Sequence, residues 1–202
     1  MLDVKSFFIG IFFCIFIAVV AIASSSLFFP QNNFSFGNFA CTNVSPLFSP
    51  GSTDDISSLI NGAQKEIDVE MYVFTDERIA QALTDAASRG GRVRVILEPR
   101  TNAYNLDTIA GALESGGVEL RWASLSYQLT HAKMMIIDGK KVLVGSINFS
   151  KAAQEKNREA AVVLEGKEVQ QYIDVFEKDW KMASALKGNK ILSNATDEGA
   201  LN

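Results

Sequence analysis

Hydrophobic residues recur along this chain in two alternating patterns, which predict strands and helices in turn. Short apolar runs indicate strands, and apolar residues three and four positions apart indicate amphipathic helices. We predict strands over residues 67–74, 93–97, 118–122, 132–137, 142–146 and 160–164, and helices over 56–63, 76–88, 105–113 and 168–182. Strands that alternate with helices predict an α/β fold in which helices flank a β-sheet.

Turn residues separate the predicted elements. Gly90-Gly91 and Gly116-Gly117 end two of the predicted helices. Asp138-Gly139 stands between two apolar runs, and Asp-Gly is a strong signal for a β-hairpin. Because a hairpin adds an antiparallel pair to strands that are otherwise connected through helices, we expect a mixed sheet.

The first 29 residues form a segment of their own. The run from Phe7 to Ala23 contains no charged residue and is close to the length that spans a bilayer. We favour a membrane anchor over residues 1–29. A cleaved signal peptide is the alternative, because Ala21-Ile22-Ala23 resembles a cleavage site, and a buried helix is a third interpretation. Lys5 weakly favours a cytoplasmic N-terminus, so we expect the following domain outside the cytoplasm, either anchored or secreted.

A chain of 202 residues has room for one domain with appendages. No residue from Ser24 to Thr53 is charged, and Asn, Ser, Phe, Pro and Gly dominate this stretch. We predict an irregular linker over residues 30–53, one folded domain over 54–184 and a polar tail over 185–202.

The net charge of −4 argues against an extended nucleic-acid surface, since such surfaces are usually basic. It leaves room for a local cationic groove, for which Lys133, Arg158 and Arg100 are candidates. The two cysteines, Cys14 and Cys41, lie in the apolar run and the linker, so no disulfide framework is expected. With a single histidine in the chain, a histidine-rich zinc or iron site is not expected either.

That histidine belongs to the most informative segment of the chain. The segment HAKMMIID (residues 131–138) is followed by GSINFS (residues 145–150). His131 and Lys133 are two residues apart on a predicted strand and therefore point to the same face. A histidine can act as a nucleophile or carry a proton, and a lysine can bind an anionic oxygen. The two segments together indicate a phosphate-binding site.

The downstream segment adds three features suited to phosphate. Gly145 relaxes the backbone, and Ser146 and Asn148 carry a hydroxyl and an amide that share strand parity, so both are expected to reach a phosphate oxygen. Counting by twos from His131 places Asp138 on the opposite face, where it begins the hairpin turn. We therefore expect Asp138 to be structural, and Ser150 to cap or shape the segment that follows.

The pattern H-x-K-x4-D followed by G-S-x-N-x-S resembles the phospholipase D superfamily, or HKD family, in the single-motif form of small bacterial endonucleases and mitochondrial-type cardiolipin hydrolases. The resemblance covers about residues 54–182, with further similarity at 72–76, 91–97 and 176–180. It implies an α/β phospholipase D-like sandwich. Thr130 stands where a second histidine is frequent, and the zinc-binding insertion of the animal mitochondrial members is absent from the sequence.

The resemblance implies specific roles for four residues. His131 is the nucleophile, Lys133 and Asn148 bind phosphoryl oxygens, and Glu159 accepts a hydrogen bond from the histidine. For Glu159 the alternative is an ordinary charged residue at the start of a strand. Gly145 and Ser150 belong to the motif as structural residues, together with Asp138.

The implied reaction is phosphodiester cleavage through a phosphohistidine, with a second acid that protonates the leaving group and then activates water. No metal ion or other cofactor is expected, because lysine supplies the positive charge. The mechanism calls for two histidines and this chain has one. We therefore predict a homodimer, formed through the active-site face, in which both copies of His131 meet at a two-fold axis.

The substrate is open between two classes of phosphodiester. The compact single-motif form favours an endonuclease, which is our first hypothesis. The acidic composition and apolar N-terminus favour a phospholipase D or cardiolipin-type hydrolase at the membrane, which is the alternative. A third possibility, a membrane-tethered binding module with a degenerate site, is disfavoured because His131, Lys133, Asn148 and Glu159 are all present.

Overall fold

The computed structural model describes residues 43–185 and residue 187. The predicted anchor or signal segment, the first part of the predicted linker and most of the predicted tail lie outside the described residues. Among the helices that are described, none has the length and apolar character needed to cross a bilayer.

The described residues form one seven-stranded sheet with the order β1-β7-β6-β5-β2-β3-β4. β2 pairs with β3, and β3 with β4, in parallel, whereas the other neighbours pair antiparallel. The predicted mixed sheet is therefore confirmed. The strands are β1 (Asn43–Phe48), β2 (Glu66–Met71), β3 (Arg92–Leu97), β4 (Glu119–Trp122), β5 (Lys133–Ile137), β6 (Lys141–Gly145) and β7 (Ala160–Glu165).

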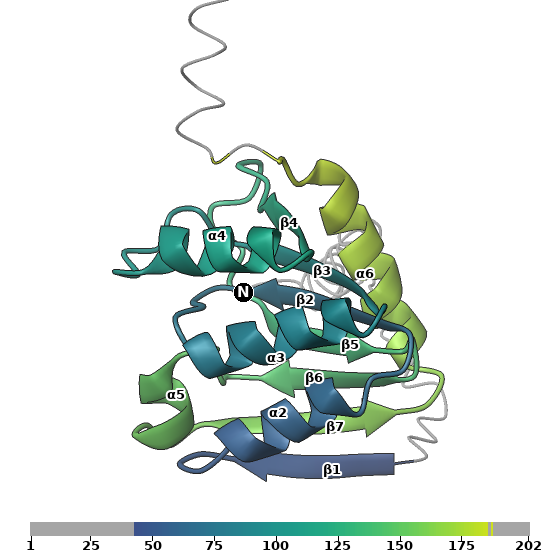
Figure 1. Ribbon diagram of the computed structural model, residues 1–202. Coiled ribbons are helices and arrows are strands. Elements are labelled where there is room, and N and C mark those ends of the chain that lie inside the picture. The colour runs from purple at the N-terminus through teal and green to yellow at the C-terminus, as the bar shows by residue number, and fades with distance from the viewer. Residues whose placement is uncertain (1–42, 186, 188–202) are drawn as a thin grey trace, which may run out of the picture. The chain divides into compact units, whose positions relative to one another are not determined.

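Helices cover both faces of this sheet (Figure 1). On one face lie α2 (Thr53–Asn61), α3 (Glu77–Ser88) and α4 (Leu106–Ser115), and α6 (Val169–Met182) lies on the other. The alternation of strand residues explains this arrangement. In β2, Ile67, Val69 and Met71 join the larger hydrophobic core, whereas Ile96 and Met134 of the neighbouring strands pack in a second core with Phe176 and Trp180 of α6.

The face under α6 also holds a buried ion pair. Arg94 of β3 donates from Nε to Asp68 of β2 at 2.7 Å and from Nη2 to Glu177 of α6 at 2.6 Å. Its guanidinium group lies over the rings of Phe176 and Trp180, at 4.9 and 5.2 Å from their centroids. Because each charge has a partner, this face tolerates charged residues that would otherwise be costly to bury.

Two elements differ from the sequence prediction. Residues 43–48, predicted to be part of a linker, form β1, which pairs with β7 at the edge of the sheet. Pro46 argues against an interior strand but is tolerated at an edge. The short helix α5 (Lys151–Glu155) follows β6 and was not predicted, because five residues are too few to establish a helical period.

Strand directions bring the motif segments to one margin of the sheet, where the ends of neighbouring strands lie side by side. We call this margin the site edge. The carboxyl ends of β2, β3, β4 and β6 and the amino ends of β5 and β7 all lie there, as follows from the pairing. Crevices at the carboxyl ends of parallel strands are where ligands of open α/β sheets bind. The motif residues therefore converge where this fold offers a binding site.

Candidate active site

His131 lies two residues before the first residue of β5 rather than inside the strand, and its side chain is exposed. The buried side chain of Lys133, the first residue of β5, reaches back to it. Lys133 Nζ donates to the backbone oxygen of His131 at 2.7 Å and lies 3.0 Å from Nδ1 and 3.2 Å from Nε2 of the imidazole ring. The ammonium group is thus within hydrogen-bonding distance of both ring nitrogens, where it can bind an oxygen of a phosphate attacked by His131.

Tyr72, which follows β2, supports both side chains and was not predicted to belong to the site. Its ring centroid lies 4.3 Å from that of His131, and Lys133 Nζ lies 4.8 Å above the Tyr72 ring. The Tyr72 N–H also donates to the oxygen of Ala132 at 2.9 Å. The aromatic residue after a strand was visible in the sequence, but only the β2–β5 pairing shows that it meets His131.

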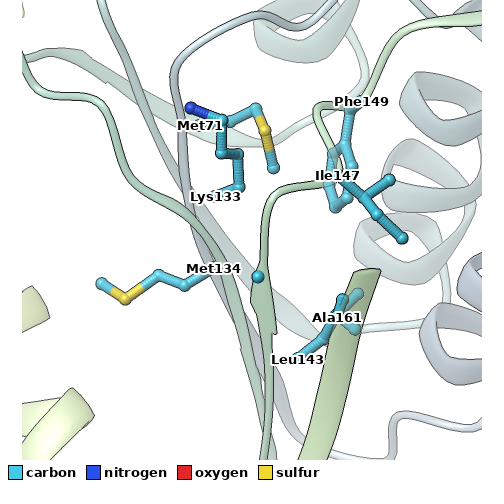
Figure 2. Close-up of a pocket in the computed structure, with 8 residues that line it drawn as sticks. Met71, Lys133, Met134, Leu143, Ile147, Phe149 and Ala161 are labelled. Atoms are coloured by element: carbon cyan, nitrogen blue, oxygen red, sulfur yellow. The ribbon is translucent and has the colours of Figure 1, made fainter. Parts of the chain in front are cut away.

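Apolar side chains form the floor behind Lys133. The pocket there is lined by Met71, Ile147, Phe149, Ala161 and their neighbours, and it has no room for a water molecule. Figure 2 shows Lys133 beside its cross-strand partner Met71, with the lysine nitrogen pointing away from Ile147 and Phe149. Burial in this setting lowers the pKa of Lys133, and the nearby charge of Glu159 opposes the shift.

Ser146 and Asn148 lie just beyond the end of β6, on the site edge. The Asn148 Oδ1 accepts from the Val73 N–H at 3.2 Å, which leaves the amide NH₂ as a donor for a phosphate oxygen. The Ser146 hydroxyl donates to Glu159 Oε2 at 2.6 Å and accepts from the Ala160 N–H at 3.1 Å. Ser146 therefore connects the end of β6 to the start of β7.

The predicted hydrogen bond between Glu159 and His131 is absent among the described residues. Glu159 instead accepts from Ser146 and, at 3.1 Å, from Asn157 Nδ2. These bonds, followed by the charge of Lys133, lower the pKa of Glu159. The carboxylate therefore remains ionised and acts on the site through Ser146 and through its attraction to the lysine.

Gly145 has a role that only glycine can perform. A Cβ at this position would lie 2.4 Å from both the Ala160 oxygen and the Ala161 Cα. Because β6 and β7 approach so closely at the site edge, any side chain here would push Ser146 away from Glu159. The structural role expected for Gly145 thus has a steric basis.

The other two motif residues lie outside the reacting region. Asp138 has a left-handed backbone (φ 53°), and its carboxylate accepts from the N–H groups of Gln64, Lys65 and Glu66 at 2.7 to 3.1 Å. Ser150 caps α5 by accepting from the Ala153 N–H at 3.2 Å. Asp138 thus fixes the start of β2, and Ser150 fixes the segment after Asn148.

A buried carboxylate after β3 holds the chain just before His131. Glu98 is fully buried, and its Oε2 accepts from the Thr130 N–H at 2.7 Å and from Arg100 Nη2 at 2.8 Å. Arg100 donates in turn to the backbone oxygens of Tyr127 and Ser124, at 2.7 and 3.5 Å. We call Glu98 and Arg100 the loop clamp.

The loop clamp pairs one of the candidates for a cationic groove with a carboxylate. Burial opposes the change, but Arg100 and the backbone donors of Thr130 and Arg100 lower the pKa of Glu98. Arg100, a candidate for a cationic groove, is thus neutralised by an ionised partner. Arg158 is also engaged, since it donates to the Ser49 oxygen at 3.1 Å and lies over the Phe48 ring.

No group of three or more His, Cys, Asp or Glu side chains in the described residues is arranged to hold a metal ion. The positive charge that lies beside the His131 ring is that of Lys133. In chemical terms, the site holds an exposed imidazole, an adjacent cation, amide and hydroxyl donors and an ionised carboxylate.

The chain is similar to several known proteins. The profile of the family described as "Cardiolipin synthase, PLD-like domain" matches residues 56–180. Phospholipase D of Rickettsia bellii (strain RML369-C) is 30% identical over 158 residues, which cover 77% of this chain and 76% of that protein. Mitochondrial cardiolipin hydrolase of Mus musculus is 30% identical over 141 residues, which cover 67% and 62% of the two chains.

A solved structure shares the fold. The phospholipase D family member Nuc from Salmonella typhimurium superposes with a TM-score of 0.67 at 28% identity, covering 72% of this chain and 99% of that one. Residues 56–180, which the family profile matches, include β2 to β7 and every motif residue at the site edge. The chain therefore belongs to the phospholipase D superfamily and is a phosphodiester hydrolase.

Proposed function

We propose that this enzyme cleaves phosphodiesters through a phosphohistidine on His131 and needs no metal ion to do so. The observation that carries the proposal is the position of Lys133 Nζ, 3.0 and 3.2 Å from the two ring nitrogens. A cation at this place attracts the phosphate to the nucleophile and stabilises charge on its nonbridging oxygens in the transition state. The NH₂ group of Asn148 is a second donor to those oxygens.

The reaction has two displacement steps. In the first, a ring nitrogen of His131 forms a bond to phosphorus while the bond to the leaving oxygen breaks, and a second acid protonates that oxygen. In the second, water attacks phosphorus, the phosphorus–nitrogen bond breaks, and the former acid accepts the proton of the water. Glu159 positions Ser146 and, through its negative charge, favours the charged form of Lys133.

The second acid in this proposal is the His131 of another copy of the chain. The sequence has a single histidine, and His131 is exposed at the site edge, where a partner can approach it. A two-fold axis beside this edge would bring two equivalent histidines to one phosphate. The predicted homodimer is therefore part of the proposed mechanism.

Phospholipid is the substrate that we favour. Two relatives of similar sequence are named for lipid hydrolysis, a phospholipase D and a cardiolipin hydrolase. The net charge of −4 and the pairing of Arg100 with Glu98 do not suit a polyanion. The endonuclease favoured by the sequence remains the second candidate, and the exposed basic residues Lys151 and Lys156, which follow the GSINFS segment in the chain, support it.

The test uses bis(4-nitrophenyl) phosphate, a soluble diester that needs neither a membrane nor a nucleic-acid groove. The full chain should hydrolyse it in excess EDTA and should accumulate an acid-labile phosphoenzyme after rapid quenching. His131→Asn should lose both signals and keep the circular dichroism spectrum of the wild type. Activity that vanishes with chelator and returns with a divalent ion would contradict the proposal.

A further inference from the structure

We infer that residues 124–129, here called the 124–129 loop, contact the surface of a phospholipid bilayer and place lipid phosphodiesters at His131. This inference rests on the proposed function and adds the surface by which the enzyme meets its substrate. It depends on four features of the loop: composition, exposure, position and rigidity.

The 124–129 loop is apolar, uncharged and exposed. Three of the eight large hydrophobic side chains that are exposed in the described residues belong to it, namely Leu125, Tyr127 and Leu129, at 40%, 39% and 43%. They recur at every second position, and no residue from Ala123 to Thr130 carries a charge. Scattered exposed apolar residues are ordinary, but a group on one loop indicates a binding surface.

The loop lies over the site edge. It connects β4 to β5, and in the sheet order β3 and β2 stand between those two strands. The loop must therefore cross the ends of β3 and β2 before it reaches His131, two residues after Leu129. Tyr104, which follows β3 at the same edge, is 91% exposed. A surface touched by these side chains is consequently next to the nucleophile.

The loop is held so that its apolar side chains stay outside the core. Arg100 binds the backbone oxygens of Ser124 and Tyr127, and Glu98 binds the Thr130 N–H. The Tyr127 hydroxyl also donates to Asp179 of α6 at 3.2 Å. Since both ends are fixed, contact with a bilayer does not require the loop to become ordered first, which lowers the entropy cost of binding.

The chemistry of the loop fits a lipid interface better than a nucleic acid. Phosphate backbones are bound mainly by lysine and arginine. The loop has neither, and the adjacent Arg100 is paired with Glu98. Leucines transfer favourably into the acyl region of a bilayer, whereas tyrosine favours its polar boundary. A loop with two leucines around a tyrosine therefore matches the layered polarity of a membrane surface.

The experiment uses the full chain and compares its rates of hydrolysis on two substrates. One is a vesicle of phosphatidylcholine and cardiolipin in equal amounts, and the other is bis(4-nitrophenyl) phosphate. Leu125→Ser combined with Leu129→Ser should lower vesicle hydrolysis by about tenfold relative to hydrolysis of the soluble diester. The loss should persist at high salt, because it does not arise from charge. Val175→Ser on α6, where Val175 is 52% exposed, is the matched control and should leave the ratio unchanged.

Several results would overturn the inference. One is an unchanged ratio in the double variant. Another is a loss of dimer in analytical ultracentrifugation, which would make the loop a subunit interface. A third is an equal loss on single-stranded DNA, which would make it a nucleic-acid surface. If the double variant fails to fold, the single variants should each lower the ratio about threefold. Failure of the wild type on the soluble diester would instead refute the proposed function.

Discussion

At the residue scale, the proposed mechanism depends on the contact between Lys133 and His131. Lys133→Met keeps the length and apolar stem of the side chain and removes its charge. We expect the rate on a soluble diester to fall by roughly 10²–10³-fold, the loss typical of removing one preorganised stabiliser of a developing charge. The melting temperature should fall little, since methionine fits the apolar pocket. Steady-state kinetics with thermal unfolding would check both, and a retained rate would show that another group supplies the charge.

Glu70 provides a residue-scale prediction about pH. It lies on β2, is 3% exposed, and its Oε2 has no hydrogen-bond partner. Burial, followed by the charge of Asp179, raises its pKa from 4.5 to about 7. The folded protein therefore keeps a proton that the unfolded chain has released. The contribution of Glu70 to stability consequently falls as the pH rises from 4.5 to 7 and is constant above that range.

Glu70→Gln should remove this dependence, because glutamine does not ionise. At about pH 8 the variant should be more stable than the wild type by at most about 3 kcal/mol, and the difference should disappear near pH 4.5. Urea unfolding at the two pH values measures the difference, and carboxylates with lowered pKa values contribute equally to both proteins. An equal difference at both pH values would contradict the assignment to ionisation.

At the scale of single elements, the Asp138 turn stabilises the fold from outside the active site. Although burial opposes the shift, the backbone donors of Gln64, Glu66 and Lys65 lower the pKa of Asp138 below 3.8. The stabilisation is thus present above pH 3.8 and is lost as the pH falls through the lowered value. Asp138→Asn should cost about 1–3 kcal/mol at neutral pH and keep kcat, and its deficit should narrow under acid conditions. Chemical denaturation across pH tests the change in stability.

For the loop clamp we expect an effect on kcat, in contrast to Asp138→Asn, which is expected to lower stability and keep kcat. In Glu98→Gln the Thr130 N–H loses a charged acceptor and Arg100 loses its ion pair, so His131 is held less firmly. We expect kcat on the soluble diester to fall about tenfold with KM nearly unchanged, since a small displacement of a reacting group is costly. Asp138→Asn is the control for stability alone. Equal kinetics in the two variants would show that the clamp does not position His131.

The sequence predicted the elements with clear periods and missed those defined by distant contacts. The hairpin at Asp138-Gly139 and the closing helix were visible because turn chemistry and amphipathic spacing are local properties. β1 was missed because only Leu47 is buried within it and because Pro46 suggests a linker until β7 is known to lie beside it. His131 and Lys133 were identified from their spacing, whereas Tyr72 and Glu98 reach the site through strand pairing that no local pattern reports.

At the scale of the whole molecule, the proposed mechanism makes turnover depend on two copies of the chain, because each copy supplies one histidine. When wild-type and His131→Ala subunits are mixed and exchange freely, each mixed dimer has one histidine and should turn over poorly. Activity should then follow about the square of the wild-type fraction. A linear dependence under demonstrated exchange, or full activity from a monomer, would show that one His131 is sufficient.

The hydrogen bonds from Arg100 to the backbone of the 124–129 loop have an evolutionary consequence. Its guanidinium group binds the backbone oxygens of Ser124 and Tyr127, and every residue type carries those oxygens. Mutations at Leu125 and Leu129 can therefore replace exposed side chains of the loop and leave these backbone hydrogen bonds in place. Under the proposed role of the loop, such mutations change the surface that meets the substrate and leave the groups around His131 in place. Substrate preference is then the property of this enzyme that mutation can alter at the least structural risk.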